Sequence, residues 1–226
     1  MKAVSKSIIA CTFAAAAMFS GAASAAPFND FTVAPGGNYA NFTADKITGN
    51  YTETAIFNDD GTFSVDLTWR AGQFVANDGN TPYDSFETGL GSAYRLYATY
   101  TASGTFSVAN GITTFNFLAD TGDLNLYMNR PGVAGSETLL ATGNPLSGEG
   151  TLNPGLSTCS ASGGINCGSF GASSTFELTE AGSAFFIAPN PFYTFSFQSG
   201  QLNNFTPVGT QTINGSLDVV FGGTEV

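Results

Sequence analysis

The chain has 226 residues, no histidine and a formal net charge of −11 at pH 7. The lack of imidazole excludes a Ser-His-Asp or Cys-His nucleophile, a histidine-ligated zinc and a histidine general base within this chain. Its acidity repels phosphate backbones and anionic lipid heads, so we expect neither nucleic-acid binding nor binding to a membrane surface.

The first 25 residues have the pattern of a cleaved signal peptide. Lys2 and Lys6 precede or open an apolar run from Ile8 to Ala23, and Ala23-Ser24-Ala25 is a small-x-small cleavage site. We therefore predict a signal peptide over residues 1–25 and a secreted mature chain over residues 26–226. Four basic residues then remain against 17 acidic ones, which gives the mature chain a net charge of −13.

Two other interpretations of this segment fit the pattern less well. A transmembrane helix needs roughly 20 apolar residues, and this run has 16. A lipoprotein signal ending at Cys11 leaves four residues after Lys6, too few for an apolar region of about 7–15 residues. We expect no transmembrane segment in the mature chain.

Strand patterns follow one another from Lys46 onward. The clearest runs from Thr62 to Arg70, where apolar residues alternate with polar ones. An Asp-Gly step in 58–61 and an Asn-Gly step in 109–111 predict two hairpins. They would join 51–57 to 62–70 and 104–108 to 112–117. Further strands are predicted over 93–101, 123–128, 192–197 and 212–221, and one helical turn over 179–184.

These elements predict an all-β fold with one domain over residues 26–226. We expect an antiparallel β-sandwich, with a jelly-roll-like or barrel-like arrangement as the alternative. Residues 142–174 are rich in Gly, Ser, Asn and Pro, which predicts a long surface loop.

Cys159 and Cys167 are the two cysteines of the mature chain. In an exported protein this even pair predicts a disulfide, which would pin the long loop. A redox or metal-binding pair is the alternative. Against it, the spacing is not C-x-x-C, and the mature chain has no other thiol or imidazole to complete a site.

Clustered acids raise two further possibilities, a glycosidase and a calcium site. A glycosidase needs two carboxylates roughly 5–10 Å apart, and the close pairs are Asp59 with Asp60, Asp120 with Asp123, and Glu177 with Glu180. Calcium is bound by Asp and Asn clusters such as those that contain Asp59, Asp60 and Asp78. Turn chemistry explains these segments as well. We therefore predict no catalytic residue and no cofactor, and keep calcium as an alternative.

The aromatic residues suggest a carbohydrate contact. Tyr97 shares a predicted strand face with Arg95, whereas Leu96 and Ala98 point to the other face. A tyrosine ring has an apolar body and a polar tip, which suits contact with a sugar. We predict Tyr97 and Arg95 as carbohydrate contacts. Other aromatic candidates are Trp69, Tyr94 and Tyr100, of which Trp69 shares the apolar face of its strand and is expected in the core.

Short blocks of sequence, spread between about Phe31 and Phe221, occur in an order that resembles the flocculation-associated PEP-CTERM proteins. These are exported proteins of Gram-negative bacteria that make exopolysaccharide. The blocks are Asp45–Glu53, Gly61–Ser64, Ala71–Phe74, Tyr94–Ala98, Gly111–Phe115, Ala181–Phe186, Pro191–Tyr193 and Gln211–Ser216. The family has no established active site, so the resemblance assigns no catalytic residue.

The resemblance implies a secreted, non-enzymatic protein of the extracellular matrix or cell surface that promotes flocculation or biofilm formation with exopolysaccharide. Family members end with Pro-Glu-Pro, an apolar span and a basic tail that an exosortase processes. These features do not precede Val226, so a released form and a sequence cut before that signal both stay open. The alternatives are a carbohydrate-active enzyme that uses paired carboxylates and a simple carbohydrate-binding module.

Overall fold

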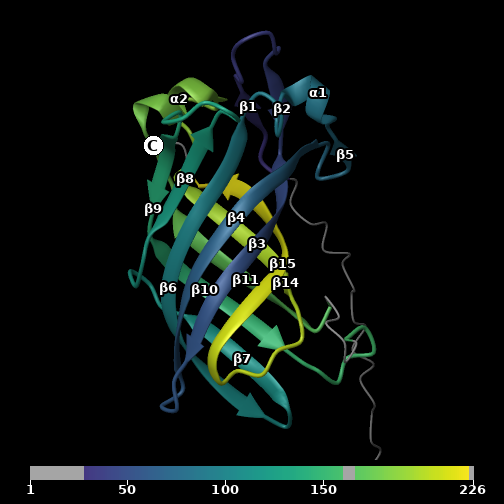
Figure 1. Ribbon diagram of the computed structural model, residues 1–226, viewed down its shortest axis with the longest axis vertical. Coiled ribbons are helices and arrows are strands. Elements are labelled where there is room, and N and C mark those ends of the chain that lie inside the picture. Colours follow the sequence, from purple (N-terminus) through teal and green to yellow (C-terminus); the bar gives the residue numbers. More distant parts are fainter. Residues whose placement is uncertain (1–27, 160–165, 224–226) are drawn as a thin grey trace, which may run out of the picture.

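The computed structural model describes residues 28–159 and 166–223, and its core is a closed antiparallel circuit of eight strands (Figure 1). The circuit closes because β4 pairs with both β3 and β6. In the order of pairing, its strands are β3 (Lys46–Phe57), β4 (Thr62–Ala76), β6 (Arg95–Ala109), β7 (Ile112–Phe117), β10 (Pro145–Leu152), β11 (Gly168–Thr175), β14 (Phe195–Leu202) and β15 (Gly209–Gly222).

The long strand β6 is a branch point in this barrel. Its residues 104–109 pair with β7, whereas residues 95–100 pair with β8 (Leu124–Asn129). Beyond β8 lie β9 (Thr138–Gly143) and β12 (Glu177–Leu178). The outer end of β4 pairs with β5 (Thr81–Pro82).

A separate small sheet contains β1 (Phe31–Val33), β2 (Phe42–Ala44) and β13 (Phe186–Ala188). Together with α1 (Ser85–Thr88) and α2 (Glu180–Phe185), it lies at one end of the barrel, and the hairpin turns that follow β3 and β6 lie at the other (Figure 1).

Alternation along the wall strands fills the barrel interior. On β4 the apolar residues Phe63, Val65, Leu67 and Trp69 are all buried, as their period-2 pattern predicts. Burying such side chains contributes about 1.5–3 kcal/mol each. The wall is therefore apolar on its inner face, and the polar residues between these positions face outward.

Phenylalanine clusters close both ends of the interior. At the end with the small sheet, the Phe31 and Phe221 rings lie 5.1 Å apart between centroids, and Phe176 lies 4.8 Å from Phe221. At the hairpin end, the Phe57 ring packs 5.2 Å from Phe106 and 5.8 Å from Phe205. These contacts fill both ends of the barrel with apolar rings.

The all-β, antiparallel class is confirmed, and so is the helical turn of 179–184. Thr179 caps α2, because its Oγ1 accepts a hydrogen bond of 3.0 Å from the Gly182 N–H. Both predicted hairpins are present, with turns at residues 58–61 and 110–111. Hydrogen-bonded pairing runs continuously through all eight strands. Each strand therefore has the same two neighbours whether the fold is called a sandwich or a barrel.

The prediction of a loop over residues 142–174 is wrong for most of that range, because β10 and β11 lie in it. Their glycines made the segment resemble a loop, but these glycines serve close packing in the wall. A side chain at Gly168 would lie 1.9 Å from the Thr151 carbonyl oxygen, and one at Gly148 would lie 2.9 Å from the Phe117 ring. Of the residues between these two strands, the structure describes 153–159 and 166–167.

The predicted disulfide is present between Cys159 and Cys167, whose Cα atoms are 4.4 Å apart. It bridges the two ends of the stretch 160–165, which lies outside the described residues, as does the signal-peptide prediction for residues 1–25. Within the described residues, no helix has the length and apolar character needed to span a membrane.

Candidate functional site

Tyr97 belongs to a stacked tyrosine pair on the outside of the barrel. Leu96 and Ala98 are buried, so the pleat of β6 turns Tyr97 outward, as its sequence pattern predicts. Tyr97 lies directly opposite Tyr127 of β8 in the strand register. Their ring centroids are 5.1 Å apart and their planes differ by 17°. The pair forms a flat, half-buried aromatic surface across two strands.

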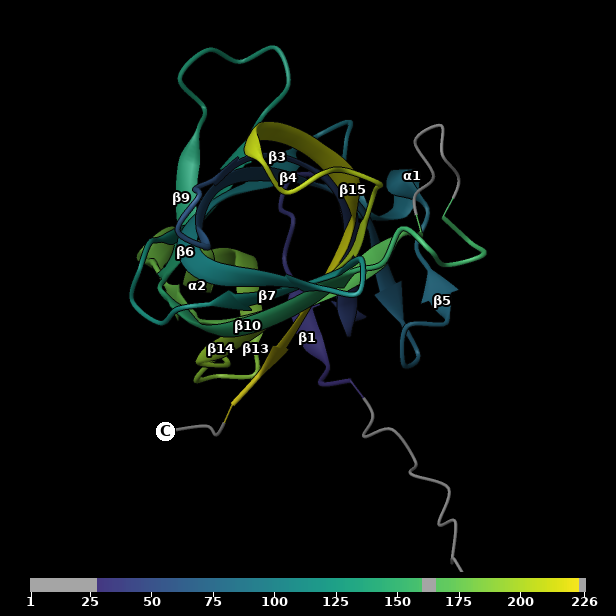
Figure 2. The same cartoon turned by 90° about the horizontal axis from the view of Figure 1, so that it is seen from below.

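The β8–β9 loop builds a groove of about 280 Å³ beside this pair. Figure 2 shows the loop projecting from the barrel wall next to β9. Its two ends are held together by Ser136, whose Oγ accepts from the Arg130 N–H at 2.9 Å and donates to the Arg130 carbonyl oxygen at 3.2 Å. The groove is lined by the charged residues Arg95, Arg130 and Glu137, together with Asn129 and Ser136.

Glu137 connects the groove to the tyrosine pair. The Tyr97 hydroxyl donates a hydrogen bond to the Glu137 carboxylate. Partial burial is the largest cause that raises the pKa of Tyr97, to about 12, and the hydrogen bond to the Glu137 carboxylate is the second. The hydroxyl therefore keeps its proton at neutral pH, and the ring is oriented from both its face and its tip.

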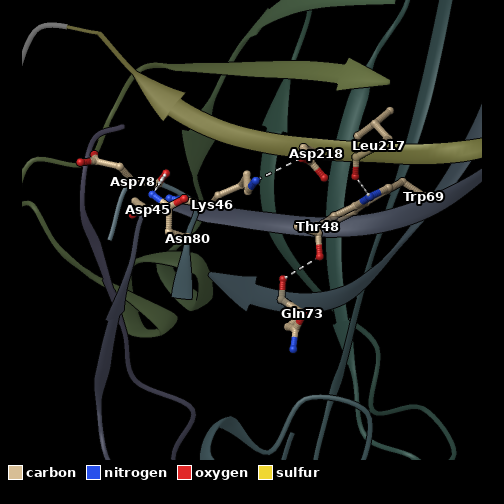
Figure 3. Close-up of polar contacts among 10 residues, drawn as sticks. Asp45, Lys46, Thr48, Trp69, Gln73, Asp78, Asn80, Leu217 and Asp218 are labelled. Atoms are coloured by element: carbon tan, nitrogen blue, oxygen red, sulfur yellow. Dashed lines mark hydrogen bonds and ion pairs between the residues drawn. The ribbon is translucent and has the colours of Figure 1, made fainter. Parts of the chain in front are cut away.

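Arginine is concentrated around the same surface. Arg95 lines the groove, and Arg70 of β4 lies opposite Tyr97 on the other edge of β6. In the part of the chain that the structure describes, the one ion pair joins Lys46 to Asp218 at 3.3 Å (Figure 3). The guanidinium groups of Arg70, Arg95 and Arg130 are thus available to an anionic or hydroxylated ligand. We call Arg95, Tyr97, Tyr127, Arg130 and Glu137 the tyrosine groove.

The other aromatic candidates lie inside the barrel. Trp69 is 2% exposed, and its Nε1 donates to the Leu217 carbonyl oxygen at 3.0 Å (Figure 3). Its indole reaches this oxygen by passing over Gly49, where a Cβ would lie 2.3 Å from Nε1. Tyr94 and Tyr100 are also buried. None of these three side chains is placed to contact a polysaccharide on the outer surface.

The acids proposed for calcium do not come together. Asp59 and Asp60 precede the 15-residue strand β4 and Asp78 follows it, so they lie at opposite ends of that strand. The Asp60 carboxylate accepts from the Thr62 hydroxyl at 2.6 Å and from the Thr62 N–H at 3.0 Å, and these two bonds lower its pKa. Asp78 accepts from the Phe28 N–H at 3.2 Å. Over residues 28–159 and 166–223, no group of three or more Asp, Glu or Cys side chains is arranged to hold a metal ion.

Figure 3 shows what organises the turn around Asp78. The buried Asp45 carboxylate accepts from the Gly79 N–H at 3.1 Å, and the Asn80 side chain donates to the Asp78 carbonyl oxygen at 3.0 Å. Burial raises the pKa of Asp45. These are the contacts of a tight turn, in which carboxylate and amide groups satisfy backbone donors and acceptors.

The remaining carboxylate pairs also lie at chain reversals or surface positions. Asp120 has a positive φ of 56° in the turn between β7 and β8, and Asp123 is exposed. Glu177 is exposed on β12, and Glu180 lies in the first turn of α2. None of these four acids lines the groove of the β8–β9 loop.

Sequence reasoning missed two kinds of residue. Tyr127, Arg130 and Glu137 join Tyr97 through strand pairing and a loop some 40 residues away in the chain, and no local pattern predicts that. Glu53 could have been found from the sequence, because it occupies an inward position of a strand with a clear alternation of buried and exposed residues. A charged residue in phase with Tyr51, Ala55 and Phe57 is a signal that could have been used.

Comparison of the chain with protein-family models, with curated proteins and with solved structures returned no match.

Proposed function

We propose that the mature chain is a secreted, non-enzymatic protein of the extracellular matrix or cell surface of a Gram-negative bacterium. In this proposal it binds exopolysaccharide and promotes flocculation or biofilm formation. The observation that carries the proposal is the stacked pair of Tyr97 and Tyr127 on the outer wall, next to a groove lined with charged and amide side chains. The resemblance of the sequence blocks to flocculation-associated proteins supports the same assignment.

The chemistry of the tyrosine groove suits an acidic or hydroxyl-rich polymer. An aromatic plane packs against the apolar face of a sugar ring, while polar side chains around it bond the hydroxyl rim. Arg95 and Arg130 add planar donors that match carboxylate, phosphate and hydroxyl groups. In a chain whose overall charge is strongly negative, these arginines give an anionic polymer a local place to bind.

A non-enzymatic role is supported by the placement of the paired carboxylates. Paired acids that divide acid and base roles need environments that push their pKa values apart. Asp59 and Asp60 lie in an exposed hairpin turn, and Glu177 and Glu180 lie on the surface of a strand and a helix start. The proposal therefore assigns binding, and no bond cleavage, to this protein.

Deletion of the gene tests the biological role, because the deleted strain should form fewer flocs and less biofilm. Binding of the purified protein to its own organism's polysaccharide tests the site. Tyr97→Ala should weaken that binding about tenfold, the scale of one lost aromatic contact. Phe86→Ala is the matched control, since this aromatic is 75% exposed on α1 and lies outside the groove.

Three results would overturn the proposal. They are unchanged settling and matrix in the deleted strain, equal binding by Tyr97→Ala and the unmodified protein, and new reducing ends in polysaccharide incubated with the protein. The last result would favour the carbohydrate-active enzyme instead.

A further inference from the structure

Glu53 is a carboxyl group inside the barrel. It lies on β3 in phase with the buried residues Tyr51 and Ala55, and it is 8% exposed. Among the described residues, no hydrogen bond or ion pair reaches its carboxyl group. Burial raises the pKa of Glu53 from 4.5 to about 7. A buried carboxyl group without a partner is costly to the fold, so its presence calls for a function.

The Glu53 side chain lines two small chambers in the apolar interior. The larger chamber has a volume of about 50 Å³ and the smaller about 20 Å³. Phe117 and Phe170 also line both chambers. Glu53 is the one charged residue in either lining. A single water molecule needs roughly 10–15 Å³ of such a cavity, so the larger chamber accepts only a few heavy atoms.

Two residues that line the larger chamber have buried polar atoms without partners. The Tyr100 hydroxyl and the Gln198 Oε1 are buried and accept or donate no hydrogen bond in the described part of the chain. The orientation of Gln198 is fixed by its other end, where Nε2 donates to the Ser196 Oγ at 2.7 Å. Tyr100 lies close enough to Glu53 for the carboxylate to add to the effect of burial and raise the pKa of Tyr100 to about 12.

The chamber wall is thin on one side. A shallow groove of about 720 Å³ runs over the outer face of β7, β10, β11 and β14. Phe117, Ala172 and Gln198 line both this groove and the larger chamber. Gly148 and Gly171 lie in the same stretch of wall and contribute no side chain. Movement of the Phe117 side chain would therefore connect the chamber to solvent.

We propose that the barrel interior binds a small primary amine with a short, unbranched apolar tail, held at its ammonium group by Glu53. The carboxylate neutralises the cation. Tyr100 and Gln198, whose buried oxygens lack partners, belong to the same lining. The apolar lining takes the tail, and the size of the chamber limits its length. Phe117, Ala172 and Gln198 form the entrance.

Nuclear magnetic resonance titration of the full mature protein with n-butylamine tests the site at about pH 8, where Glu53 is ionised and the amine is protonated. Signals from the methyl groups of Val65, Leu67 and Leu126, which line the chamber, should shift saturably. Butan-1-ol has the same tail without the charge, so it should bind at least about tenfold more weakly.

Glu53→Gln should weaken n-butylamine binding at least about tenfold, since it removes the charge and keeps the shape of the side chain. Glu177→Gln removes an equal charge from the exposed strand β12 and should bind as the unmodified protein does. Circular dichroism and thermal unfolding establish that both variants are folded. Tyr97→Ala, which tests the polysaccharide role on the outer wall, should leave amine binding unchanged.

The proposal is overturned if the lining methyl signals do not move, or if Glu53→Gln and the unmodified protein bind the amine equally. Equal binding of butan-1-ol and n-butylamine would overturn the role of Glu53 as the ammonium partner.

Discussion

The barrel contains the same pair of side chains, a tyrosine and a glutamate, in two opposite settings. On the outer wall, Tyr97 donates to Glu137 and stacks on Tyr127. Three residues further along β6, Tyr100 points inward toward the space that Glu53 occupies, and its hydroxyl has no partner in the described structure. The parity of the strand decides between the two settings.

A polar pair therefore has different consequences on the two sides of one sheet. The outer pair is satisfied by its own hydrogen bond and by solvent, so it costs little and presents a prepared surface. The inner groups are desolvated and unpaired, so they lower the stability of the fold, and a ligand that satisfied them would raise it. The inner and outer regions therefore respond differently to mutation and to pH.

The largest effect expected in this comparison comes from the inner wall. Trp69→Ala should lower the free energy of unfolding by about 3–5 kcal/mol, because it leaves a cavity and removes the bond to the Leu217 carbonyl oxygen. Chemical denaturation measures the loss. Phe86→Ala, on the exposed face of α1, should change stability by less than about 0.5 kcal/mol. Equal losses in the two variants would show that the interior is not the packed core.

The second effect is a dependence of stability on pH that arises from Glu53. Below about pH 4.5 its carboxyl group is neutral in the folded and the unfolded chain, so it contributes no difference. Between 4.5 and about 7 the unfolded chain releases the proton and the folded chain keeps it. The free energy of unfolding therefore falls as pH rises through this window, by a total of about 3 kcal/mol.

Denaturation measured across this pH window checks the prediction, with Glu53→Gln as the comparison. The variant should lose this part of the pH dependence and be more stable than the unmodified protein above about pH 7. Tyr51 and Tyr100, whose pKa values Glu53 raises further after burial, stay protonated throughout. An unchanged pH profile in Glu53→Gln would contradict the assignment of the effect to this residue.

The third effect belongs to the outer wall and to binding alone. Tyr127→Ala should weaken polysaccharide binding about tenfold, as Tyr97→Ala does, because each removes one half of the stacked surface. The double variant should lose less than the sum of the two free-energy changes, since the rings act as a unit. Affinity electrophoresis in gels that contain the polysaccharide measures both. Full additivity would indicate two independent contacts.

Much of this fold could be predicted from the sequence, because the patterns that predict it involve residues close together in the chain. The alternation of 62–70, the Asp-Gly and Asn-Gly turns and the Thr179 cap each depend on residues close together in the chain. Tyr97 was correctly given an outward face for the same reason. The strands β10 and β11 were not predicted, because their many glycines give these segments the composition of a loop. In the structure, glycines there let large neighbouring rings pack against the backbone.

The two sites were harder to predict, because each is built from residues that strand pairing brings together from distant parts of the chain. Tyr127 meets Tyr97 through the β6–β8 register, and Glu137 arrives from the following loop. Inside the barrel, Glu53, Tyr100 and Gln198 come from three strands that the closed circuit brings around one space. A local pattern predicts which face a residue occupies, but not which distant residues share that face.

The smallest expected effects on the free energy of unfolding have opposite signs on the two sides of β6, although the substitution is the same. Tyr97→Phe removes a hydroxyl that donates to Glu137, so it should lower the free energy of unfolding by about 0.5–1 kcal/mol. Tyr100→Phe removes a buried hydroxyl without a partner, so it should raise the same quantity by about 1 kcal/mol. Denaturation of both variants under one condition measures the two signs directly. A loss of stability in Tyr100→Phe would mean that the inner hydroxyl is satisfied in solution, for example by water in the chamber. The Tyr100 hydroxyl beside Glu53 would then already have a hydrogen-bond partner, and the case for an amine in the chamber would be weaker by that group.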